Sequence, residues 1–104
     1  MAKKRITISD RGGELVADPP TLECTGGDTV RILNNTDEDV VWILSDATIF
    51  GATVTDTILA HKATNPPKNA SATAGIFFSS YLVIGTKSGR KAKGNSDPVI
   101  IVEN

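Results

Sequence analysis

The chain has few of the side chains from which most enzyme and metal centres are built. Its 104 residues include one cysteine, one histidine and one methionine. An internal disulfide is therefore impossible, and the chain has few residues from which a common nucleophile–base pair of catalysis could be built. P-loop, Gly-x-Ser-x-Gly, His-Glu-x-x-His and dinucleotide-binding motifs are also absent. We therefore expect a protein that is not an enzyme and that has no cofactor.

A strong net charge and long apolar runs are absent as well. Eleven basic and twelve acidic side chains give a net charge of −1, which offers no global attraction for nucleic acid or anionic lipid. No apolar run approaches the roughly 20 residues that cross a bilayer. The basic residues 3–5 are not followed by the apolar segment of a signal peptide. We expect another protein as partner, no membrane span and, for the chain as given, a cytoplasmic location; the oligomeric state stays unknown.

The chain does contain a series of short segments with the pattern of strands. Ile6 and Ile8, and later Val30 and Ile32, alternate with polar residues, which places them on the buried faces of two strands. Residues 40–44 are a continuous apolar run, typical of a strand that is covered on both faces. This run is the expected centre of the core.

The strand pattern weakens between residues 45 and 69. We expect an irregular crossover there, with one helical turn near residues 56–61, and a further strand at residues 76–78. Short strands with turn signals every 8–15 residues or so, and little helix, indicate an all-β fold, a Greek-key antiparallel β-sandwich. The length predicts a single domain over residues 1–104.

The C-terminal part holds the densest group of positive charge. Two β-branched segments, residues 81–84 and 98–102, flank a loop rich in Gly, Lys and Arg, so we expect two adjacent antiparallel strands joined by a long loop. The loop carries Lys87, Arg90, Lys91 and Lys93. This basic group is either a solubilising tip made adaptable by Gly85, Gly89 and Gly94, or a contact for phosphate or an acidic partner. No aromatic residue is interleaved for base stacking, which favours the first interpretation.

Two stretches of the chain resemble the cupredoxin family. Residues 24–35, CTGGDTVRILNN, are similar to its x-x-x-G-D-T-V-x-(F/I)-x-N segment, after which the next strand supplies the first copper histidine. Residues 81–84 and 97–102, the latter DPVIIV, are similar to its last two strands. The resemblance implies a cupredoxin-like sandwich over nearly the whole chain.

The same resemblance does not imply a copper site. A blue-copper centre needs two imidazoles and a thiolate, usually with an axial thioether, whereas this chain has His61 as its one histidine and Met1 as its one methionine. If Tyr81 anchors the family pattern, the thiolate position falls on Gly85 and the second imidazole near Ser88. Neither residue ligates copper, so we expect no type 1 site.

Three functions therefore stay open. The leading hypothesis is a non-catalytic binding or protein-interaction module. The second is an electron-transfer or metal-handling protein whose site is completed by a second chain through Cys24 or His61. The third is a carbohydrate- or polyanion-binding module that uses Trp42 or the basic loop.

Each of these candidate residues also has a structural interpretation, which we favour. Cys24 on an alternating strand is then a small buried hydrophobe, His61 a surface histidine, and Trp42 within its apolar run a core residue. Residues 37–39, Asp-Glu-Asp, supply oxygen donors but lack the spacing of a calcium loop, so we expect a solvated turn there.

Overall fold

The computed structural model describes residues 1–93 and 97–104 and contains ten strands within these ranges. They are β1 (Lys3–Arg11), β2 (Glu14–Asp18), β3 (Thr21–Cys24), β4 (Thr29–Asn35), β5 (Val40–Leu44), β6 (Val54–Ile58), β7 (Lys68–Asn69), β8 (Ile76–Ser80), β9 (Leu82–Gly85) and β10 (Val99–Glu103). In the described part of the chain no helix is long and apolar enough to cross a membrane.

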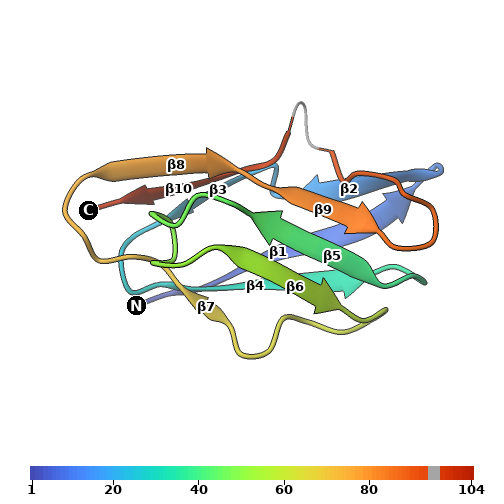
Figure 1. Ribbon diagram of the computed structural model, residues 1–104, viewed down its shortest axis with the longest axis horizontal. Helices are drawn as coiled ribbons and strands as arrows, with labels where there is room; N and C mark the ends of the chain where they lie inside the picture. Colours follow the sequence, from blue (N-terminus) through green and yellow to red (C-terminus); the bar gives the residue numbers. More distant parts are fainter. Residues whose placement is uncertain (94–96) are drawn as a thin grey trace.

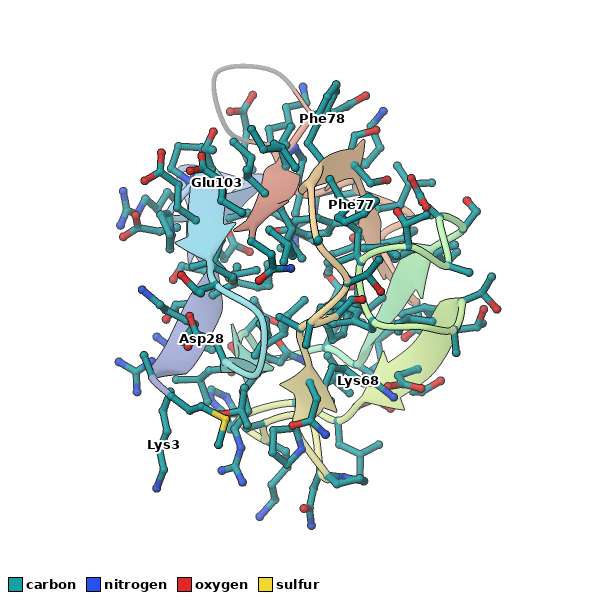
Figure 2. All side chains as sticks on the ribbon, turned by 90° about the vertical axis from the view of Figure 1, so that its left-hand side faces the viewer. Lys3, Asp28, Lys68, Phe77, Phe78 and Glu103 are labelled. Atoms are coloured by element: carbon teal, nitrogen blue, oxygen red, sulfur yellow. The ribbon has the colours of Figure 1, made fainter. Side chains whose placement is uncertain are left out.

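The strands form two layers (Figure 1). One layer is the sheet β2-β1-β4-β7, and the other contains the sheets β3-β10-β8 and β6-β5-β9. These last two are continuous along the chain because β8 and β9 are separated by Tyr81 alone. Most pairs are antiparallel, but β1 pairs in parallel with β4, and β10 with β3. The predicted all-β sandwich is confirmed, and Figure 2 shows its layers end-on around the interior.

The predicted core positions are buried. Ile6, Ile8, Val30 and Ile32 have no exposed surface. On β5, which lies between β6 and β9, Val40, Trp42 and Leu44 are buried while Val41 and Ile43 are half-buried. The apolar run at residues 40–44 is therefore central, as expected, but only one of its faces is fully covered.

The expected helical turn near residues 56–61 is wrong. Val54–Ile58 is strand β6, and it pairs antiparallel with β5 so that Val54 lies opposite Leu44 and Ile58 opposite Val40. A spacing of four residues fits one face of a helix and one face of a strand equally well. Pairing with β5, which buries Val54 and Ile58, decides between them.

The expected pairing of the last two strands is also wrong. Strand β10 pairs antiparallel with β8, with Ile101 opposite Phe78, whereas β9 pairs with β5. The side of β9 that faces away from β5 is covered by the segment 90–93 instead: the N–H of Ala92 donates to the carbonyl of Val83 at 2.8 Å. Residues 94–96 of the expected loop, Gly94 included, lie outside the described residues.

Candidate functional site

Three turns meet at one end of the sandwich, on the right-hand side of Figure 1. They are the tip of the β1–β2 hairpin at residues 10–13, which includes the end of β1, the β4–β5 turn at residues 36–39, and the segment 86–91 that follows β9. Gly85 and Ser88, the two positions to which the family resemblance assigns copper ligands, lie in the third turn or next to it. This end of the molecule is therefore the place to test for a metal centre.

The β4–β5 turn is built around the buried Asn34. Its Nδ2 donates to the carbonyl oxygens of Glu38 at 2.8 Å and Ile58 at 3.0 Å, and its Oδ1 accepts from the N–H of Thr36 at 3.2 Å. An asparagine that bonds the backbone two and four residues ahead closes a tight turn in the manner of an Asx motif. Asn34 thereby fixes the position of Glu38, two residues before the start of β5.

The Glu38 carboxylate is bound from several sides. Oε1 accepts from the backbone N–H groups of Lys87 at 3.1 Å and Ser88 at 3.0 Å. Oε2 accepts from Ser88 Oγ at 2.9 Å and from Arg90 Nη2 at 2.9 Å. The backbone hydrogen bond from Ser88, followed by that from the Arg90 guanidinium, lowers the pKa of Glu38 to about 2. The expectation of a solvated turn is therefore wrong for Glu38, which is buried.

Arg90 connects all three turns. Besides Glu38, its Nη2 pairs with Asp10 Oδ2 at 3.0 Å, and its Nη1 donates to the carbonyl of Gly13 at 2.7 Å. The hydrogen bonds that the guanidinium donates to Asp10 and then to Glu38 raise the pKa of Arg90, so the guanidinium remains charged. We call Asp10, Glu38, Ser88 and Arg90 the ion-pair cluster.

The cluster leaves no room for a side chain at Gly85. A Cβ placed there would meet the Glu38 carboxylate and would lie 2.8 Å from Ser88 Oγ. Glycine is therefore the residue that lets β9 pass beside Glu38. A cysteine at this position, as the family pattern would have it, is sterically incompatible with the cluster as it stands.

The donors at this end do not fit a blue-copper centre. Such a centre needs imidazole and thiolate ligands. Here the corresponding positions contain Gly85 and Ser88, beside a carboxylate whose oxygens already accept hydrogen bonds from two backbone N–H groups, a hydroxyl and a guanidinium. The adjacent guanidinium would also repel a bound cation. In residues 1–93 and 97–104 no group of three or more His, Cys, Asp or Glu side chains is placed to hold a metal ion.

The predicted basic group is tied into the fold only in part, because Lys87, Lys91 and Lys93 are exposed. Arg90 is half-buried in the ion-pair cluster, and Lys91 Nζ pairs with Asp97 Oδ1 at 3.3 Å. Lys93 is tied to β2 by its backbone, accepting from the N–H of Ala17 at 2.9 Å and donating to the carbonyl of Leu15 at 3.0 Å. Beside this segment lies a surface depression of about 270 Å³, lined by Gly13, Glu14, Leu15, Arg90, Lys91 and Lys93.

The remaining candidates lie apart from the cluster. Trp42 has no exposed surface and packs edge-on against Phe50 and Tyr81, with ring centroids 5.7 and 6.2 Å away. A ligand platform needs an exposed ring, so the assignment of Trp42 to an interaction surface is wrong. Cys24 is buried, and burial raises the pKa of its thiol to about 11. His61 is exposed, with Nε2 2.8 Å from Asp37 Oδ1.

Comparisons with known proteins support the fold. No family model matches the chain, and no curated protein matches it either. Among solved structures, a pseudoazurin from Sinorhizobium meliloti matches with a TM-score of 0.60 and 15% identity. The match covers 100% of this chain and 76% of the pseudoazurin chain. A reduced Cu(I) form of an amicyanin mutant matches with a TM-score of 0.58 and 16% identity. This match covers 95% of the present chain and 80% of the amicyanin chain.

These neighbours define the fold class. The chain is a cupredoxin-like β-sandwich, as its sequence resemblance predicted. At this level of identity the likeness concerns the fold and leaves the function to be argued from the site.

Proposed function

We propose that the chain is a non-catalytic protein-interaction module built on a cupredoxin-like sandwich. At the end where the family resemblance would place the copper ligands, it has the ion-pair cluster in place of a type 1 copper site. One observation carries the proposal: the Glu38 carboxylate, bound by Ser88 and Arg90, fills the space beside Gly85. A cluster that satisfies its own charges within the chain stabilises turns, and it offers neither an open coordination position nor a reactive group.

The surface next to the cluster suits an acidic segment of a partner protein. Lys87, Arg90, Lys91 and Lys93 are all contributed by one short segment. Lys91 and Lys93 border the depression of about 270 Å³, and Leu15 supplies an apolar floor. Glu14 also lines this depression, but three basic side chains outnumber it, and such an excess of positive charge steers the approach of carboxylates more than it adds raw affinity.

Copper titration tests the absence of a type 1 site. The protein is titrated with Cu(II) while visible absorption and EPR spectra are recorded, and the His61→Ala variant is titrated in parallel to identify weak binding at the surface imidazole. We expect no stoichiometric blue absorption and no type 1 EPR signal. A stoichiometric type 1 signal in the wild-type protein would contradict the proposal.

Charge reversal tests the interaction surface. The triple variant Lys87→Glu, Lys91→Glu, Lys93→Glu is compared in pull-down experiments with a control of equal charge change on β1 and β4, namely Lys3→Glu, Arg5→Glu, Arg31→Glu. The partner should be retained by the wild type and the control and lost by the first variant. Equal retention by both variants would reject this surface.

One observation favours the second candidate, a metal site completed by another chain. The His61 imidazole and the Asp37 carboxylate form an exposed pair, which two copies could present to one ion. Light scattering with added Cu(II) or Zn(II) decides this: metal-driven association that is lost in His61→Ala would support it, and unchanged scattering would reject it. Cys24 is buried and does not contribute to such a site.

A further inference from the structure

Among residues 1–93 and 97–104, no strand pairs with the second edge of strand β8. The order β3-β10-β8 places it at the end of its sheet. Gly75 and Asn104 exchange backbone hydrogen bonds of 3.3 and 2.9 Å, and the N–H of Tyr81 donates to the carbonyl of Pro98 at 3.1 Å. Because backbone groups alternate sides along a strand, the odd-numbered residues 75–81 face β10. The N–H and C=O groups of Ile76, Phe78 and Ser80 therefore face the open edge.

Beyond Tyr81, where the chain continues as β9, the corresponding strand edge is covered by β5. Leu82 and Ile84 of β9 lie opposite Ile43 and Val41 of β5. Strand β5 ends at Leu44, so it does not reach β8. The open edge is thus a place where the second layer lacks one strand.

The residues at this edge are apolar and exposed. The exposed fraction is 68% for Ile76 and 71% for Phe78, whereas Phe77 packs against the core. Figure 2 shows Phe78 at the outer rim of the molecule. No charged residue occurs between Lys68 and Lys87, and β8 contains no proline. Natural sheets usually protect an open edge with a charge, a proline or a bulge, and β8 itself has neither charge nor proline.

We propose that β8 is a dimer interface, at which a second copy of this chain pairs antiparallel with it across a two-fold axis at Phe78. In that register Phe78 lies opposite Phe78 of the other copy, and Ile76 lies opposite Ser80. The same three residues then supply every donor and every acceptor, and the two phenyl rings become cross-strand neighbours on the outer face. The strand is self-complementary and uncharged, which is why a second copy fits it better than an unrelated peptide.

The dimer is expected to be reversible. The net charge of −1 leaves little repulsion between copies. Five-residue strands bury well below the roughly 1,200 Å² of a standard interface, so dissociation constants of about 10 μM to 1 mM are expected. The inference does not depend on the proposed function, because β8 lies outside the ion-pair cluster and copper titration does not probe it.

Sedimentation equilibrium of the intact protein, from about 10 μM to 1 mM, tests the proposal together with amide hydrogen exchange measured by NMR. Phe78→Lys places a charge on the exposed side chain. Ser80→Pro removes an N–H that faces the open edge and costs no bond to β10. The matched control is Leu59→Lys, which changes an apolar side chain of 56% exposure outside the strands.

We expect the wild type and Leu59→Lys to dimerise alike, and both edge variants to raise the dissociation constant about ten-fold or more. Amides of Phe77 and Ser79 should be protected at every concentration, and those of Ile76, Phe78 and Ser80 only in the dimer. A wild type that stays monomeric at 1 mM or so, or a dimer that both edge variants leave intact, overturns the proposal. So does binding of a foreign extended peptide at β8 by a protein that does not self-associate.

Discussion

The two ends of the sandwich are each anchored by a carboxylate that accepts backbone N–H groups. At the ion-pair end this is Glu38. At the opposite end it is Asp28, whose Oδ1 accepts from Ala2 at 2.8 Å and whose Oδ2 accepts from Thr25 at 2.9 Å. The backbone hydrogen bonds from Thr25 and then Ala2 lower the pKa of Asp28.

The ends differ in where the partners come from. The partners of Asp28 are the backbone N–H groups of Thr25, three residues away, and Ala2, 26 residues away, and no guanidinium takes part in these two hydrogen bonds. The partners of Glu38 lie 49 to 52 residues away and include Arg90, which also contacts the β1–β2 turn. Asp28 thus joins its own turn to the N-terminal segment through backbone groups alone, whereas Glu38 joins two turns through a buried ion pair with Arg90.

The largest effect is expected from Glu38→Ala. It removes the acceptor of Lys87, Ser88 and Arg90 and leaves the guanidinium with Asp10 and the carbonyl of Gly13 as its partners. We expect the free energy of unfolding to fall by about 3 kcal/mol, measured by urea denaturation. The control is Glu103→Ala, which removes an exposed carboxylate and should change the free energy of unfolding by less than about 0.5 kcal/mol. Equal effects would remove the distinction between the cluster and the surface.

Gly85→Ala should be the next most damaging. The new methyl meets the Glu38 carboxylate and Ser88 Oγ, which costs about 2 kcal/mol of unfolding free energy. Because the clash is with the side chain of Glu38, the double variant with Glu38→Ala should lose clearly less than the sum of the two single changes. Strict additivity in this double-mutant cycle would show that the methyl is obstructed by something else.

Acid should weaken the ion-pair end. The pKa of Glu38 is about 2 in the folded chain against an ordinary 4.5, so the unfolded chain binds more protons between these values. The stabilisation by Glu38 is complete above pH 4.5 and is lost as the pH falls toward 2. Urea midpoints measured from pH 6 or so downward should fall less steeply in Glu38→Gln than in the wild type. Parallel curves would contradict the assigned role.

Asp28→Asn should have the smallest effect of the four. The amide oxygen still accepts one of the two N–H groups, and no buried cation loses its partner. The urea midpoint should fall, but by less than in Glu38→Ala, and Asp46→Asn, in an exposed turn, serves as the comparison. A fall larger than that of Glu38→Ala would reverse the ranking of the two ends.

Much of the fold was predictable from the sequence. Alternation placed Ile6, Ile8, Val30 and Ile32 in the core, and the apolar run around Trp42 was identified as central. The errors arose where two patterns coincide: Val54 and Ile58 fit a helix as well as a strand. The pairing of β10 with β8 instead of β9 was missed because apolar composition identifies strands without naming their neighbours.

The candidate site was predictable only in part. Gly85 and Ser88 were identified through the family resemblance, and Arg90 through the basic group. Asn34 and Asp10 were missed, and Glu38 was interpreted as part of a solvated turn, although an asparagine at the end of an alternating strand is a weak signal of a closed turn. The extents of the domain, the location in the cell and the interaction surface stay predictions.

The sequence by itself determined most of the strands, which of their faces are buried, and that the chain has no second imidazole for a blue-copper site. These properties depend on composition and on periods of two residues, which are local. Only the tertiary structure decided that Glu38 is buried against Ser88 and Arg90, and that β8 has an open edge. Both depend on contacts between residues far apart in the chain, whose energies no local pattern encodes.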